Sequence, residues 1–156
     1  MNAPLRKTNS KKASSWNRAL VTITCLSILA AFFWGVLRES ENVYPHLKLA
    51  FPVADQFTKH SADTFLALKN DIQIGYVTIS EGHGYGGPLK TATAIDKTGL
   101  IIGVSIIRQR ETPSWFQKIL DSEYTKSFVG KKATDLFQIG NDVDAVSGAT
   151  YTSRAI

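Results

Sequence analysis

The segment with the most distinctive chemistry is residues 144–150, which reads Asp-Ala-Val-Ser-Gly-Ala-Thr. It combines small residues with two hydroxyls and precedes residues 152–156, which resemble the first turn of a helix. In one interpretation Thr150 or Thr152 caps that helix by accepting hydrogen bonds from its free N–H groups. In the other, those N–H groups bind a phosphate, which could be esterified to a hydroxyl. Spacing alone favours the cap.

A second unusual segment is residues 82–88, which contain four glycines in seven positions. It has neither the strand–helix context of a dinucleotide-binding turn nor the lysine of a P-loop. We expect Gly84, Gly86 or Gly87 to adopt positive φ or to let the backbone approach a cofactor closely. Tyr85 and Trp115 fit either the core or the face of a flat cofactor ring.

Alternating apolar residues predict the elements that hold these segments. Strands are expected at residues 64–68, 72–80, 89–95 and 100–107, with a hairpin turn at 96–99. Thr112 and Pro113 predict the start of a helix with Thr112 as its N-cap, and a second short helix is expected at 121–128. Residues 42–59 have the pattern of a connection or a short helix. Strands followed by helices indicate an α+β fold, a twisted antiparallel sheet with packed helices.

The charge is distributed unevenly along the chain. The net charge is +5, from 18 cations and 13 acids, but residues 1–38 hold six cations and no acid. Residues 39–156 hold the remaining twelve cations (18 − 6) and all thirteen acids. The excess of positive charge therefore belongs to the N-terminal tail and does not predict a nucleic-acid-binding surface. A single cysteine, Cys25, excludes a disulfide framework and a cysteine-ligated metal centre within this chain.

Residues 19–37 carry no charge and are bounded by Arg18 and Arg38. A helix of this length rises about 28 Å, enough to cross a hydrocarbon core. The cations before it predict a cytoplasmic basic tail (1–18), a single transmembrane anchor (19–37) and an exported domain (39–156). A buried helix of a soluble protein and a cleaved signal peptide are the alternatives.

The segment Asp144-x-x-Ser147-Gly148-Ala149-Thr150 resembles the flavinylation motif of the FMN-binding domain family. That domain occurs in the G subunit of the Rnf electron-transport complex, in the C subunit of sodium-pumping NADH:quinone oxidoreductase and in exported parts of regulators such as those of nitrous oxide reduction. The resemblance implies that Thr150 carries FMN through a phosphoester, with the other four residues as the recognition motif. A magnesium-dependent flavin transferase would install the FMN from FAD.

Further segments are similar to the same family in matching order: residues 51–57, 84–89, 95–104 and Glu111-Thr112-Pro113. The resemblance implies that Tyr85, Gly86, Gly87, Glu111 and Thr112 lie at the flavin. Where the Rnf branch often has Gly-Leu-Gly after this Pro, the chain has Ser114-Trp115-Phe116, which is nearer to the regulator-like branch.

The implied function is that of a membrane-anchored flavoprotein that transfers electrons to or from other membrane redox subunits. Its expected location is the bacterial cytoplasmic membrane, in contact with lipid, with the N-terminus cytoplasmic and the C-terminal domain periplasmic. No acid–base pair, nucleophilic triad or metal site is evident in the sequence, so Thr150 is expected to be a site of modification. A redox-sensing regulatory module and a binding domain without flavin remain the alternatives.

Overall fold

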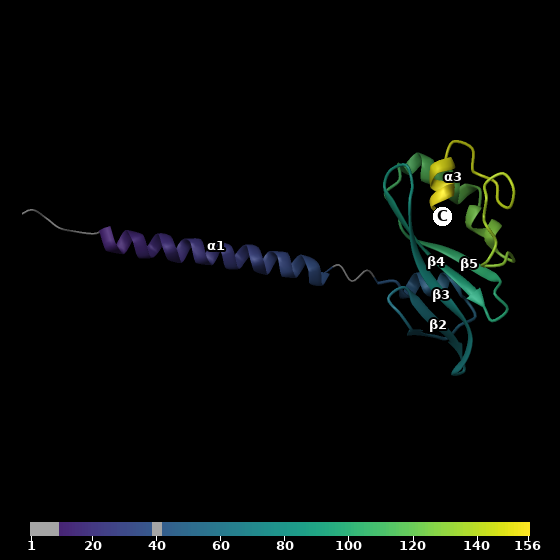
Figure 1. Cartoon of the computed structure of the whole chain (residues 1–156), viewed down its shortest axis with the longest axis horizontal. Coiled ribbons are helices and arrows are strands. Elements are labelled where there is room, and N and C mark those ends of the chain that lie inside the picture. Colours follow the sequence, from purple (N-terminus) through teal and green to yellow (C-terminus); the bar gives the residue numbers. More distant parts are fainter. Residues whose placement is uncertain (1–9, 39–41) are drawn as a thin grey trace, which may run out of the picture. The chain divides into compact units, whose positions relative to one another are not determined.

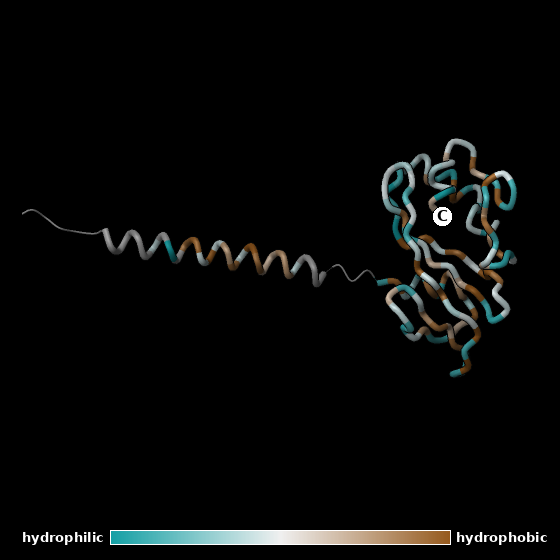
Figure 2. Tube along the Cα trace, in the orientation of Figure 1, coloured by the Kyte–Doolittle hydropathy of each residue, from teal (hydrophilic) through white to brown (hydrophobic). Residues whose placement is uncertain are grey.

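The structure is a computed structural model that describes residues 10–38 and 42–156. The chain divides into two compact units, Met1–Glu41 and Asn42–Ile156. In the first unit, α1 (Ser10–Arg38) is a helix of 29 residues, whose apolar residues gather in its middle part (Figure 2). Among the described residues, none of the helices meets the combined requirement of length and apolar content for crossing a membrane. The predicted basic tail lies partly outside the described residues.

The second unit is built on a five-stranded antiparallel sheet whose spatial order, β1-β2-β3-β4-β5, follows the chain (Figure 1). The α+β class is therefore confirmed. The strands are β1 (Gln56–Lys59), β2 (Thr64–Lys69), β3 (Ile72–His83), β4 (Pro88–Asp96) and β5 (Ile101–Arg108). The prediction for residues 42–59 was incomplete, because four of them form β1 at the sheet edge and only the first part is helical.

The predicted hairpin turn joins β4 to β5. Gly99 adopts φ +86° there, and the Asp96 carboxylate accepts hydrogen bonds from the Thr98 hydroxyl, at 2.7 Å, and from the N–H groups of Thr98 and Leu100. These hydrogen bonds lower the pKa of Asp96 below its usual value, and the one from the Thr98 hydroxyl has the largest effect. The turn is thus fixed by local polar contacts that the sequence already contains.

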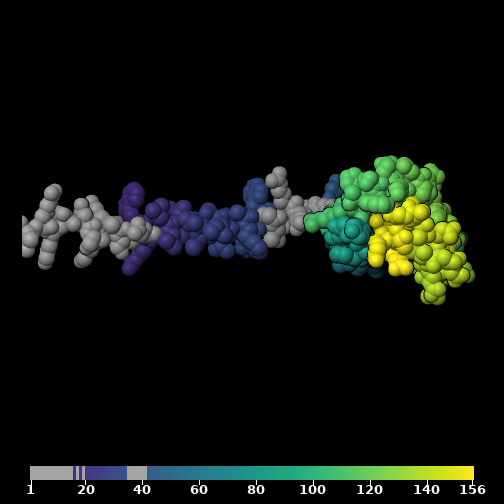
Figure 3. Space-filling model, turned by 90° about the horizontal axis from the view of Figure 1, so that it is seen from above, coloured from purple at the N-terminus to yellow at the C-terminus, as the bar shows by residue number. Residues whose placement is uncertain are grey.

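Successive strand residues point to opposite faces of the sheet, and each face is covered by helices. On one face α2 (Tyr44–Ala50) packs Leu47 and Ala50 against a core that includes Val77. On the other face lie α3 (Pro113–Asp121), the 3₁₀ helix η1 (Tyr124–Phe128) and α4 (Thr150–Ala155), around a core that includes Ile95 and Ile119. In Figure 3 the yellow C-terminal segment lies on the surface beside the green segment that contains α3.

Tyr124 connects η1 to α4 in this second core. Its side chain is buried, and its hydroxyl donates a hydrogen bond to the Ser153 carbonyl at 3.2 Å. Burial raises the pKa of Tyr124 above its usual value of 10.0. The folded protein therefore holds this proton to higher pH than the unfolded chain does.

We expect the stabilisation that Tyr124 provides to be complete below the unfolded pKa and to be lost as the pH rises through the folded pKa. Tyr124→Phe should lower the free energy of unfolding near neutral pH by about 1 kcal/mol, because one buried hydrogen bond is lost. Above pH ~10 the wild type should lose stability more steeply than the variant, since the phenylalanine at position 124 has no hydroxyl that could ionise. Urea denaturation across this pH range checks the difference, and parallel curves would contradict it.

Candidate functional site

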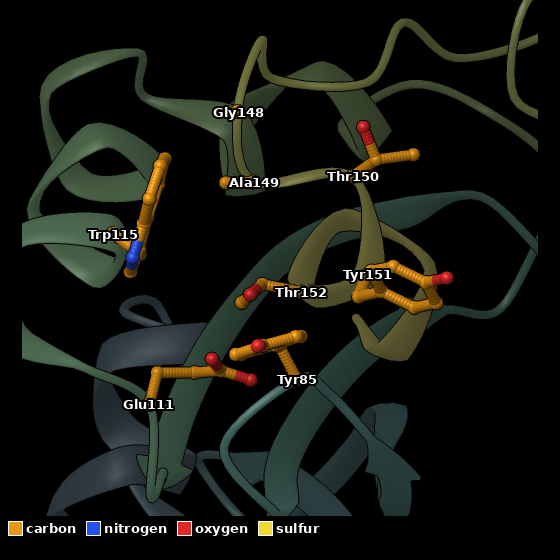
Figure 4. A pocket seen from close by; sticks show the side chains of 8 residues that line it. All are labelled: Tyr85, Glu111, Trp115, Gly148, Ala149, Thr150, Tyr151 and Thr152. Atoms are coloured by element: carbon orange, nitrogen blue, oxygen red, sulfur yellow. The ribbon is translucent and has the colours of Figure 1, made fainter.

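A cavity of about 240 Å³ opens where the β3–β4 loop, α3 and α4 meet (Figure 4). It is lined by Tyr85, Glu111, Trp115 and residues 148–152. Tyr85 is 76% exposed, Tyr151 63% and Trp115 41%, so these rings surround the cavity instead of filling the core. The alternative that placed Tyr85 and Trp115 in the core is therefore wrong.

The glycines of the β3–β4 loop hold this loop against residues 110–111. A Cβ on Gly84 would lie 1.8 Å from Glu111 Oε1, and one on Gly86 would lie 2.3 Å from the Arg110 carbonyl oxygen. Gly87 has φ +139°, which glycine adopts readily. Close approach and positive φ both occur, as predicted, but the close approach is to this chain's own backbone and carboxylate.

Glu111 is the buried charged group of the cavity, with 6% of its surface exposed. Its Oε2 accepts a hydrogen bond from the Gly86 N–H at 3.1 Å, whereas its Oε1 is buried and has no partner. Leaving a buried acceptor unpaired costs about 1–3 kcal/mol, more for a charged group. Glu111 therefore keeps one unpaired acceptor, which lies against Gly84 beside the cavity.

The small-residue segment leads into α4 without the predicted cap. Ala149 is the N-cap residue and makes no side-chain capping bond, so the interpretation of Thr150 or Thr152 as the cap is wrong. Thr150 is the first helical residue and is exposed, whereas Thr152 is 1% exposed. Ser153, which sequence reasoning missed, ties the segment together: its hydroxyl donates to the Ala149 carbonyl and accepts from the Val146 N–H, each at 3.0 Å.

Gly148 brings the segment against α3. It has φ +78°, and a Cβ there would lie 2.9 Å from Trp115 Cζ3 and 3.0 Å from Lys118 Nζ. The Lys118 ammonium lies over the Trp115 ring, 4.3 Å from its centre, as residues three apart on one helix can do. A glycine is therefore needed at 148 both for its backbone conformation and for space.

We expect Gly148→Ala to destabilise the protein by about 2–4 kcal/mol, which combines a left-handed backbone cost of about 1–2 kcal/mol with overpacking against Trp115. Gly99→Ala is the matched control, because Gly99 has φ +86° but nothing within 4 Å of its Cβ position. It should cost only the backbone part. Urea denaturation measures both, and equal losses would show that the contact with Trp115 is not tight.

The structure brings together only part of the predicted set. Tyr85, Glu111, Gly148, Ala149 and Thr150 line the cavity, and Gly86 and Gly87 adjoin it through residues 110–111. Thr112 instead takes the N-cap position of α3, although without a side-chain capping bond. Asp144 and Ser147 line a different hollow, between η1 and the segment that precedes α4. Tyr151 and Thr152 are cavity residues that sequence reasoning missed, and their position directly after the motif is the signal that could have found them.

Comparisons with known proteins agree with this site. The model of the FMN-binding domain family matches residues 84–156, a range that contains all the cavity-lining residues. The G subunit of the proton-translocating ferredoxin:NAD(+) oxidoreductase complex of Clostridium ljungdahlii is 32% identical in an alignment 151 positions long, gaps included, that covers 87% of this chain and 82% of that protein.

Two further relatives are matched over a smaller share of their length. The G subunit of the ion-translocating oxidoreductase complex of Vibrio parahaemolyticus is 34% identical over 64% of this chain and 52% of that protein. The G subunit of the Na(+)-translocating ferredoxin:NAD(+) oxidoreductase complex of Acetobacterium woodii is 27% identical over 70% and 56%, so the chain spans just over half the length of these two. Since the family model spans the cavity and the Clostridium relative is matched along most of both sequences, this chain belongs to the FMN-binding domain family.

Proposed function

We propose that this protein carries FMN and passes electrons within a membrane oxidoreductase complex of the kind to which its relatives belong. The observation that supports this most is the orphaned Glu111 Oε1 at a cavity walled by aromatic rings. Bound FMN supplies the ability to accept and release electrons, while the protein sets its position and surroundings. Electron transfer is favoured because the relatives are named as oxidoreductase subunits.

The residues present fit a flavin. Tyr85, Trp115 and Tyr151 offer aromatic faces to a flat ring system, and the Glu111 carboxylate would supply an acceptor for the ring's imide N–H. The cavity of about 240 Å³ is below the range of about 300–1,000 Å³ typical of small-molecule sites. It would therefore hold part of the cofactor, and the remainder would lie outside the cavity.

We propose that the FMN is joined covalently to Thr150. The Thr150 hydroxyl is exposed and points away from Tyr85 and Glu111 in Figure 4, so a transferase can reach it. The Thr150 oxygen bonds to the flavin-side phosphorus of FAD, the pyrophosphate bond breaks, AMP leaves and the hydroxyl proton passes to the transferase or solvent. With six residues, α4 is too short for its dipole to carry this argument, which depends on exposure and on the motif.

The test is to produce the protein with and without a magnesium-dependent flavin transferase. We expect colourless protein without the transferase, and with it a yellow colour that survives denaturation. Mass spectrometry of the peptide covering residues 144–154 should then show the mass of FMN less one water. Unmodified protein after co-production would contradict covalent attachment.

We further propose that residues 19–37 anchor the protein in the membrane, with residues 39–156 on the periplasmic side beside other redox subunits. The support is in the sequence, which has 19 uncharged residues between Arg18 and Arg38 and a strong cation excess before them. A phosphatase fused after Ile156 should be active in the periplasm, and the protein should stay in the membrane fraction at high salt. Activity of a cytoplasmic reporter alone at that position would reverse the proposed orientation.

A further inference from the structure

Lys118 lies beside the modification motif, although nothing in its sequence context indicates a role there. Its ammonium group lies over the Trp115 ring, and 3.0 Å from where a Cβ of residue 148 would be. Two Cα steps of about 3.8 Å each separate Gly148 from Thr150, so the two Cα atoms are at most about 7.6 Å apart. Lys118 therefore lies against a residue only two positions before Thr150.

Within the part of the chain that the structure describes, Lys118 forms no ion pair with a carboxylate. In residues 42–156, ion pairs join Arg108 to Glu81 and Lys126 to Glu123, and Lys118 takes part in neither. Trp115 holds the ammonium by a cation–π contact, which fixes its place while leaving its N–H donors available. Gly148 adds to this, since any side chain there would displace the ammonium.

Other cations near the motif are less well placed. Lys131 lines the separate hollow shared with Asp144 and Ser147, and the backbone of Lys132 pairs with that of Leu100 in an isolated β-bridge at the hairpin. Arg154 faces a different cavity, against the sheet. Lys118 is therefore the cation whose contacts include both a cavity-lining ring and the motif itself.

We propose that Lys118 is a phosphate-positioning residue, which binds the phosphate of the flavin and so holds the ring at the cavity. This inference rests on the proposed function. An ammonium group and a phosphate oxygen form a charge-assisted hydrogen bond, which is stronger than a neutral one. Trp115 then has two roles. Its ring lines the cavity, and the same ring holds the Lys118 ammonium by a cation–π contact.

The experiment uses the full-length protein made without transferase, titrated with FMN and with riboflavin, which has the same ring but no phosphate. Quenching of flavin fluorescence reports binding. We expect the wild type to prefer FMN, and Lys118→Met to weaken FMN binding about tenfold while leaving riboflavin binding unchanged. Lys118→Arg should retain most of the preference, and Lys131→Met, a matched lysine in the other hollow, should have no effect.

The other possible outcomes separate the role of Lys118 from the existence of the flavin cavity. Equal binding of FMN and riboflavin by the wild type, or an unchanged preference in Lys118→Met, would overturn the role of Lys118 and leave the flavin cavity standing. Equal weakening of both flavins by Lys118→Met would show a structural role only, and thermal melting of the variant would confirm it. Failure of both flavins to bind would contradict the role of Lys118 and of the cavity in binding free flavin, whereas the proposed function is decided separately by covalent attachment in the presence of the transferase.

Discussion

Thr150→Val is expected to abolish covalent FMN attachment completely when the protein is produced with a flavin transferase. Valine keeps the shape of threonine and removes the hydroxyl oxygen to which the phosphorus must bond. Since Thr150 is an exposed residue in the first turn of α4, its replacement should leave the fold intact. Intact-mass spectrometry measures the attached FMN, and circular dichroism verifies the fold.

Two controls make this result specific. Thr150→Ser keeps a hydroxyl at the same place and should still be modified. Thr152→Val makes the same substitution at a residue that is 1% exposed, where a transferase cannot reach, and should leave attachment at Thr150 in place. FMN found on Thr150→Val, or lost from Thr152→Val while that variant is folded, would contradict Thr150 as the attachment residue.

Gly86→Val is expected to cause the largest loss of stability in the β3–β4 loop, about 3 kcal/mol or more. Its Cβ would lie 2.3 Å from the Arg110 carbonyl oxygen and 3.0 Å from Glu111 Cα, and backbone atoms cannot move aside as a flexible side chain can. The shift would also break the hydrogen bond from the Gly86 N–H to Glu111 Oε2, which would leave both oxygens of that buried carboxylate without a donor.

Urea denaturation measures this loss, with Lys97→Ala as the control because Lys97 is exposed in the hairpin turn. The control should change the free energy of unfolding by no more than about 0.5 kcal/mol. Flavin binding should fall in parallel in Gly86→Val, since Glu111 is displaced. A loss below about 1 kcal/mol would show that the loop relaxes and that close approach is not required.

The parts of the fold that could be predicted from sequence are those set by local patterns. The long alternation in β3, the polar turn at Asp96 and the Thr-Pro start of α3 each contain their own signal. β1 was missed because four residues are too few to show a period of two. The cap of α4 was mispredicted because α4 begins after Ala149, which has no side-chain acceptor, and the preceding segment is held instead by the hydrogen bonds of Ser153 to residues 146 and 149.

At the candidate site, too, the residues that lie within local sequence motifs could be predicted, whereas contacts made by packing could not. A family motif pointed to Tyr85, Glu111 and Thr150, because each lies within a short run of recognisable residues. The unpaired oxygen of Glu111 and the place of Lys118 could not be predicted, since both depend on packing between segments distant in the chain. Asp144 and Ser147 show the converse, because residues close in sequence to Thr150 line another hollow.

The order of strands in the sheet also has a consequence for folding kinetics. Each strand pairs with its neighbour in sequence, so the meander needs only short loops to close and is expected to form quickly. The contact between Gly82 and Ala155 closes a far longer loop, and a six-residue helix is not stable alone. We therefore expect α4 to dock last. The proposed modification of Thr150 would then compete in time with this docking, and the earlier of the two would decide whether the helix docks onto a chain that already carries the flavin.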